Sequence, residues 1–145
     1  MEFRGVLCAA GSDTILALDS AMSRDHRKLR AFQEADALVL EIYPASANLP
    51  ATERYGLQAQ IRRAALSVPT NLVEGAARPT TADYCHFVAI ACGSARECEY
   101  LLSVASRLGF LGEALAEPLI GRYNRLAGSL LALRRALRPS LRREP

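Results

Sequence analysis

A proline stands inside the most strongly helical stretch of this chain, residues 53–75. Pro69 has no amide hydrogen to donate to the carbonyl of Ala65, and its ring crowds that turn, so an isolated helix would lose about 3 kcal/mol or more here. Packing has to compensate for such a loss. We therefore expect this helix to bend at Pro69 and to form, among three straighter helices, a surface for copies of the same chain.

The composition suits close-packed helices in a chain of one domain's size. Half of the 145 residues are hydrophobic, 6% are aromatic and none is Trp, so the core must be built from Leu, Ala, Ile and Val. No segment approaches the apolar length of a transmembrane helix, and we expect no membrane association. The spacing of Cys8, Cys85, Cys92 and Cys98 indicates neither a zinc site nor a disulfide framework. A reducing cytoplasm fits these cysteines best.

Apolar residues recur at three- and four-residue steps in four segments. The expected helices cover residues 29–47, 53–75, 82–108 and 113–137. Their short connections predict an all-α fold, an antiparallel up-down four-helix bundle with a proline-kinked second helix.

Residues with cap chemistry mark the expected helix ends. Thr52 is the expected N-cap of the second helix. Thr80 or Thr81 caps the third helix, with Asp83 as its capping-box partner. Gly109 lies where a left-handed residue would end the third helix.

These elements divide the chain into three parts. Residues 1–28 are expected to be an extension outside the domain, either disordered or a mis-called gene start whose true initiator is Met22. Residues 29–138 form the four-helix bundle domain. Pro139 ends the last helix, and residues 139–145 form a basic C-terminal tail.

Positive charge gathers at the C-terminal end. The formal net charge is +3, yet residues 122–143 contain seven arginines and no acid, which leaves 18 − 7 = 11 bases against 15 acids elsewhere. This end is therefore the electropositive pole. Apart from Lys28 every basic residue is Arg, whose guanidinium recognises phosphate and carboxylate. A GC-rich genome is the simpler explanation of the same bias.

The sequence contains no recognisable catalytic or metal-binding group of residues. Cys85 and His86 are adjacent, and adjacent helical residues point about 100° apart, which argues against a thiolate and base pair. A di-metal bundle needs Glu-x-x-His from two helices, but neither His26 nor His86 has a Glu three residues before it. We expect no enzymatic activity, no metal and no cofactor.

Polar residues follow Pro69 at helical spacing. Asn71 and Glu74 are three residues apart, and so are Ser94 and Glu97 on the next helix. If these faces meet, they form a polar layer that satisfies the groups freed by the proline, and an oligomer interface is the other interpretation. The expected structural motif comprises Pro69, Asn71, Glu74, Gly75, Ser94 and Glu97.

Several short motifs occur together in the second and third expected helices. They are Glu53–Leu57 (ERYGL), Gln60–Ala65 (QIRRAA), Ser67–Asn71 (SVPTN), Glu74-Gly75, and Ala91–Ser94 (ACGS) followed by Glu97–Glu99 (ECE). Together they resemble the four-helix-bundle family of 23S ribosomal RNA intervening-sequence proteins, also called S23-type, over residues 29–137. The chain departs from the family pattern in having Arg for Lys, Val73 for a common Ala, and Cys92 and Cys98 where Leu is common.

The resemblance implies a small bacterial protein that assembles as a homopentameric ring. It also implies a distant relationship to the accessory protein of diversity-generating retroelements, which binds nucleic acid and a reverse transcriptase. Expected partners are therefore further copies of the chain, RNA or DNA, and a reverse transcriptase or another protein.

Arginines on the helix surfaces are the candidate nucleic-acid contacts, although charged helix faces are often only solvated surface. The candidates are Arg54, Arg62, Arg63, Arg78, Arg122, Arg125, Arg134, Arg135 and Arg138. The aromatic residues Tyr55, Tyr84, Tyr123, Phe32 and Phe87 occupy core-like positions, so binding should be directed to the backbone rather than to bases. The expected function is a non-enzymatic, homo-oligomeric helical bundle that binds RNA or a ribonucleoprotein. The alternative is an oligomeric protein-interaction scaffold without nucleic-acid binding.

Overall fold

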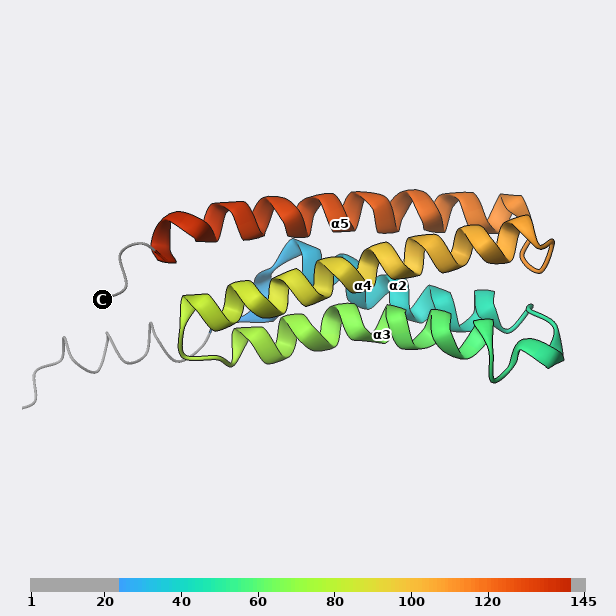
Figure 1. Ribbon diagram of the computed structural model, residues 1–145, viewed down its shortest axis with the longest axis horizontal. Coiled ribbons are helices and arrows are strands. Elements are labelled where there is room, and N and C mark those ends of the chain that lie inside the picture. Colours follow the sequence, from blue (N-terminus) through green and yellow to red (C-terminus); the bar gives the residue numbers. More distant parts are fainter. Residues whose placement is uncertain (1–23, 142–145) are drawn as a thin grey trace, which may run out of the picture.

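The computed structural model describes residues 24–141, with side-chain environments for residues 24–138. In chain order the elements are η1 (His26–Lys28), α2 (Arg30–Ser46), η2 (Ala51–Glu53), α3 (Leu57–Ala76), α4 (Thr81–Arg107) and α5 (Glu113–Leu141). Helix α2 packs on α3, α3 on α4 and α4 on α5, whereas α2 and α5 touch only sparsely (Figure 1). The described part of the chain is an all-α, up-down four-helix bundle without strands, as the apolar periodicity predicts.

The core is built from the expected apolar stripes. Leu38 and Ile42 of α2 are fully buried, and Tyr123 of α5 is the largest fully buried side chain. Helix α4 contributes small residues, with Ala91 and Ala95 at 0% exposure. Because alanine side chains are short, they let the neighbouring helices approach α4 closely.

The ends of α4 agree with the predicted cap chemistry. Thr80 is the N-cap, and its hydroxyl accepts a hydrogen bond from the Asp83 amide at 3.0 Å. Gly109 has a φ of 73°, a left-handed conformation that glycine adopts without strain. The amide of Phe110 donates to the Ala105 carbonyl at 2.9 Å, and that of Gly109 donates to Ser106 at 2.9 Å. These two bonds form a Schellman motif.

The predicted start of the second helix is wrong. Thr52 lies in η2, and α3 begins only at Leu57, with Gly56 as its N-cap. The Glu53 carboxylate, expected inside the first turn, instead accepts the Leu57 amide at 3.0 Å from outside the helix. A carboxylate near the N-terminus of a helix is favourable whether it lies in the first turn or just before it. The sequence alone therefore does not distinguish a helix that starts at residue 53 from one that starts at residue 57.

Pro69 and Pro139 both lie inside helices that continue through them. Helix α3 passes through the buried Pro69 without interruption. Helix α5 extends to Leu141, so the expectation that Pro139 ends it is wrong. Proline has a helical φ, and a helix can continue past it with the loss of one hydrogen bond.

Arg24 anchors the start of the described chain to the turn between α3 and α4. Its guanidinium donates to the Thr81 hydroxyl at 2.8 Å and lies 4.8 Å from the centroid of the Tyr84 ring. Residues 1–23 of the expected extension and residues 142–145 of the expected tail lie outside the described residues. Within residues 24–141, no helix is both long and apolar enough to cross a membrane.

Candidate functional site

Charge is segregated along α5. Glu113 and Glu117 lie in its first two turns, and every charged residue of the described part of α5 beyond them is an arginine. This order complements the helix dipole, which favours acids at the N-terminus and bases at the C-terminus. The basic positions are Arg122, Arg125, Arg134, Arg135 and Arg138.

Arg122 is committed to holding the bundle together. Its guanidinium donates to Glu34 at 2.7 Å and also pairs with Glu41, so that one α5 side chain bridges two turns of α2. Hydrogen bonding to Glu34 and then to Glu41 raises the pKa of Arg122 above its ordinary value. Its side chain is only 24% exposed. This arginine is therefore occupied within the molecule.

Arg62 is likewise occupied. It donates to the Ser46 hydroxyl at 2.8 Å and to the Tyr43 carbonyl at 3.1 Å, and its guanidinium stacks 4.7 Å from the centroid of the Tyr43 ring. These contacts satisfy groups in the last turn of α2 and join α2 to α3.

Arg63 and Arg78 form exposed ion pairs. Arg63 donates to Glu97 of α4 at 2.8 Å, with 65% of its own side chain exposed. Arg78 pairs with Glu74 one turn earlier, and its guanidinium lies 4.9 Å from the centroid of the Phe87 ring. Exposed pairs of this kind are weak, so both guanidinium groups can still be drawn to another anion.

The remaining five candidate arginines form no ion pair with any residue in the part of the chain whose side chains are described, 24–138. Arg135 and Arg138 are exposed on the last turns of α5, and Arg134 is half-buried. The five are Arg54, Arg125, Arg134, Arg135 and Arg138.

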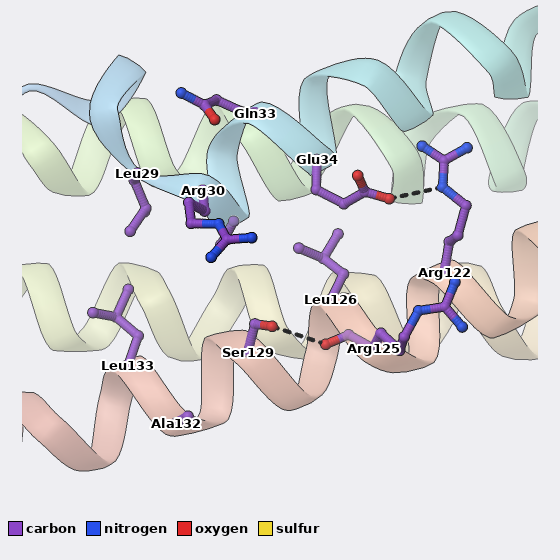
Figure 2. A pocket seen from close by; sticks show the side chains of 11 residues that line it. Leu29, Arg30, Gln33, Glu34, Arg122, Arg125, Leu126, Ser129, Ala132 and Leu133 are labelled. Atoms are coloured by element: carbon purple, nitrogen blue, oxygen red, sulfur yellow. Dashed lines mark hydrogen bonds and ion pairs between the residues drawn. The ribbon is translucent and has the colours of Figure 1, made fainter.

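An open groove of about 980 Å³ runs between the start of α2 and the C-terminal half of α5 (Figure 2). The side chains of Leu29, Leu126 and Leu133 extend into the space between the two helices. Arg30 and Arg125 also line it. We call it the α2–α5 groove. Nothing in the sequence indicates this groove, because it depends on how loosely two helices distant in sequence pack together.

The polar residues near Pro69 form a small network centred on Ser67. The Asn71 amide donates to the Ser67 carbonyl at 2.7 Å and to its hydroxyl at 3.0 Å. The Ser67 hydroxyl lies 2.8 Å from that of Ser94 on α4. Ser67 thus connects Asn71 to Ser94. It is absent from the expected motif, although it stands four residues before Asn71, the spacing that brings helical side chains together.

The other motif residues have separate contacts. Glu74 pairs with Arg78, and Glu97 pairs with Arg63, so neither carboxylate takes part in the serine network. Gly75 is buried where α3 meets α4, and a Cβ atom there would lie 2.7 Å from the Phe87 Cβ. Glycine is therefore required by the close approach of the two helices.

Exposed aromatic residues correct one expectation. Tyr55 does not occupy a core position; it is 90% exposed beside the N-terminus of α3. Tyr100 on α4 is 62% exposed. Tyr84 and Tyr123 are buried, as expected. Exposed tyrosine rings can stack on nucleobases, and Tyr55 lies next to the unpaired Arg54.

The buried thiol of Cys98 is chemically unreactive. Desolvation by burial raises its pKa to about 12. The Tyr123 hydroxyl is also buried and lies near this thiol, but it makes no hydrogen bond of ordinary geometry with the described residues. Cys85, Cys92 and Cys98 are all free. Within residues 24–141 no group of three His, Cys, Asp or Glu side chains is arranged to hold a metal ion.

Residues 27–132 match the family described as 23S rRNA-intervening sequence protein. Among solved structures, the chain is similar to a protein of unknown function from the S23 ribosomal protein family of Bacteroides thetaiotaomicron. The TM-score is 0.65 at 20% identity, over 71% of this chain and 96% of that chain, a likeness that concerns the fold alone. No curated protein matches the chain. Because the family match spans most of the sequence, the chain belongs to the 23S rRNA-intervening sequence protein family.

Proposed function

We propose that this protein is a non-enzymatic, homo-oligomeric helical bundle that binds RNA through arginines at the C-terminal end of α5. One observation carries the proposal: Arg135 and Arg138 are exposed and form no ion pair with the described residues. Guanidinium groups without acidic partners are available to phosphate, whose counterions are released on binding. The family name supports RNA as the nucleic acid, and DNA and a reverse transcriptase are further candidate partners.

Tyr55 and Arg54 supply a second contact in this proposal. Arg54 is exposed and without an ion-pair partner in the described chain, and it precedes a tyrosine whose ring is 90% exposed. An arginine and an aromatic ring side by side can hold one phosphate and stack one base. Binding would still be directed mainly to the backbone, because the arginines far outnumber the exposed rings.

Salt dependence tests the proposal. With a labelled uridine oligomer of about 20 nucleotides as the probe, the logarithm of affinity should fall with the logarithm of salt concentration, by about 0.7 per phosphate contact. The variant Arg135→Glu/Arg138→Glu should bind roughly tenfold more weakly and with a smaller slope. Arg107→Glu is the matched control. Arg107 is the last residue of α4, far from the C-terminal end of α5, and this variant should bind as the parent does. Binding that is absent, or insensitive to salt, would exclude the proposal.

Self-association is the second part of the proposal. Leu66 and Val73 of α3 are 41% and 40% exposed and lie seven residues apart on one helical stripe. Ile90, on the adjacent α4, is 39% exposed. Gly93 is exposed and has no atom within 4 Å of a would-be Cβ, so another helix could approach closely there. We infer that this face, together with a bend at Pro69, forms the subunit contact of a pentamer.

Native mass tests the assembly. The parent protein should have a mass several times its 15.7 kDa chain. Leu66→Asp/Val73→Asp should reduce this mass toward that of one subunit. Leu40→Asp, at a 73% exposed position on α2, is the control and should leave the mass unchanged. A monomer at all accessible concentrations would contradict the proposal.

The alternative function is an oligomeric scaffold that binds a protein and no nucleic acid. The exposed apolar side chains of α3 and α4 support this alternative as well as self-association. Retention of a multimeric mass together with no salt-dependent RNA binding would favour it. In both cases the free cysteines of the described chain support a reducing, cytoplasmic location.

A further inference from the structure

The α2–α5 groove combines an apolar floor with positive charge. Leu126 belongs to the buried core, and Leu29 and Leu133 pack against the core while partly exposed, so the apolar floor of the groove is continuous with the interior. Figure 2 shows these side chains between the two helices. The groove exists because α2 packs mainly on α3 and α5 mainly on α4, which leaves the fourth seam of the bundle open.

The charges that line the groove are not balanced. Arg122 is neutralised by Glu34 and Glu41 and closes one end of the groove. Arg30 and Arg125 form no ion pair within residues 24–138, and both are exposed. Two free guanidinium groups therefore flank an apolar strip. A ligand that complements this surface is apolar along one side and acidic at its margins.

We propose that the α2–α5 groove binds an amphipathic helix of a partner protein, with apolar residues toward Leu29 and Leu133 and acidic residues toward Arg30 and Arg125. The 12 residues from Arg122 to Leu133 correspond to about 17 Å of α5, or about three helical turns. This is the length over which residues at i, i+4 and i+7 of a bound helix would contact the groove. The inference is independent of RNA binding.

The same features disfavour nucleic acid as the occupant. No aromatic residue lines the groove, so unpaired bases would have no ring on which to stack. Polar phosphodiester groups would also have to lie along the leucine floor. The proposed RNA contacts Arg135 and Arg138 do not line the groove.

Fluorescence anisotropy with a designed peptide tests the proposal on the full chain. The probe is a labelled helical peptide of about 16 residues with leucines at i, i+4 and i+7 and glutamates on both flanks. It should bind the parent protein. Binding should weaken at least tenfold with Arg30→Glu/Arg125→Glu and should recover when lysines replace the glutamates of the peptide.

Matched controls separate the groove from general charge effects. Arg135→Glu removes an arginine of the same helix outside the groove and should leave peptide affinity unchanged. A peptide with serines in place of the leucines should not bind. If Arg30→Glu/Arg125→Glu alters the circular dichroism spectrum, Arg30→Gln/Arg125→Gln takes its place and should still weaken binding. Lack of peptide binding, or affinity that the groove substitutions do not change, overturns the proposal.

Photocrosslinking identifies the occupant. A photoreactive amino acid replaces Ser129, which lines the groove and is exposed. Adducts with the peptide support the proposal. The peptide should compete with any other occupant of the groove. If adducts with residues 1–23 of the chain or with a second copy persist at saturating peptide concentration, the proposal is overturned. Adducts with the uridine oligomer that are lost in Arg30→Glu/Arg125→Glu would overturn it in favour of a phosphate site.

Discussion

The hydroxyl groups of Ser67 and Ser94 lie 2.8 Å apart and join α3 to α4 two residues before Pro69. Ser94 is 8% exposed, so the contact is well shielded from water. Asn71 donates to the same Ser67 hydroxyl and so links the two helices to the turn that contains the proline. This hydroxyl pair is a polar contact between the α3 and α4 parts of the sequence motif that is better shielded from water than the Arg63–Glu97 ion pair.

A double-mutant cycle should reveal this coupling. We expect Ser67→Ala and Ser94→Ala each to lower the free energy of unfolding by about 1 kcal/mol, with a coupling energy of at least about 0.5 kcal/mol. Urea unfolding measures all four proteins of the cycle. Ser129→Ala, where the hydroxyl is exposed, is the control and should change stability by less than about 0.5 kcal/mol. Additive effects of the two alanines would show that the hydroxyls are not coupled.

Gly75 and Gly93 should respond in opposite directions to alanine. At Gly75 a Cβ would meet the Phe87 Cβ at 2.7 Å, and overpacking of this kind costs about 1–3 kcal/mol. At Gly93 nothing in the same chain lies within 4 Å, so Gly93→Ala should stabilise the helix of a dissociated subunit by about 0.5–1 kcal/mol. Thermal unfolding of the two variants measures the contrast. A stabilising Gly75→Ala would contradict the close helix approach.

Replacement of Pro69 tests the expected bend. Pro69→Ala restores an amide donor for the Ala65 carbonyl but removes a buried ring, so we expect a folded subunit with altered assembly. Circular dichroism checks the fold, and light scattering checks the native mass. An unchanged oligomer would count against a bend that serves the subunit contact.

The buried thiol should make stability fall at alkaline pH. The pKa of Cys98 is about 12 in the folded protein, while an unfolded thiol titrates near 8.5, so the folded state binds the proton more tightly between these values. The contribution of Cys98 to stability is therefore constant below about pH 8.5 and falls by up to about 1.4 kcal/mol per pH unit above it. Urea unfolding over this range measures the slope.

Two substitutions isolate the origin of this slope. Cys98→Ala should reduce it, whatever the variant's stability at neutral pH. Tyr123→Phe removes a buried hydroxyl that has no described hydrogen-bond partner, and it should leave neutral stability unchanged or raise it by up to about 1 kcal/mol. A large loss of stability in Tyr123→Phe would mean that the hydroxyl has a favourable partner, of which the Cys98 thiol is the nearest candidate.

The bridge from Arg122 to α2 should be worth more than an exposed ion pair. Arg122→Ala removes contacts with both Glu34 and Glu41, and we expect it to destabilise the bundle by about 1 kcal/mol. Arg63→Ala removes one pair in which the arginine is 65% exposed, and its effect should stay below about 0.5 kcal/mol. Chemical unfolding at low and high salt compares the two. Equal effects would indicate that the bridge adds nothing beyond a surface pair.

The sequence predicted the helices well, because apolar periodicity and cap chemistry are local signals. Thr80 and Gly109 each mark an end of α4 by their own residue chemistry. The start of α3 was misplaced because Thr52 and Glu53 are also acceptable in a short 3-10 turn, and Glu53 reaches Leu57 from there. Pro139 was misjudged because a proline near a helix end removes only one hydrogen bond.

The candidate site could be predicted only in outline. Residue type alone marked the arginines, but their partners are set by packing: Glu34 lies 88 residues from Arg122 in sequence and only 2.7 Å from it in space. Tyr55 resembles a core residue by spacing, and only the late start of α3 leaves it 90% exposed. The tertiary arrangement determines which arginines remain without an acidic partner, and it also creates the α2–α5 groove.

The uneven charge of α5 gives each subunit a permanent electrical polarity along its long axis. Were identical subunits to stand side by side in one orientation, their basic ends would crowd onto a single rim and repel one another. A polyanion seated on that rim would relieve the repulsion, so ligand and ring would stabilise each other by the same coupling free energy.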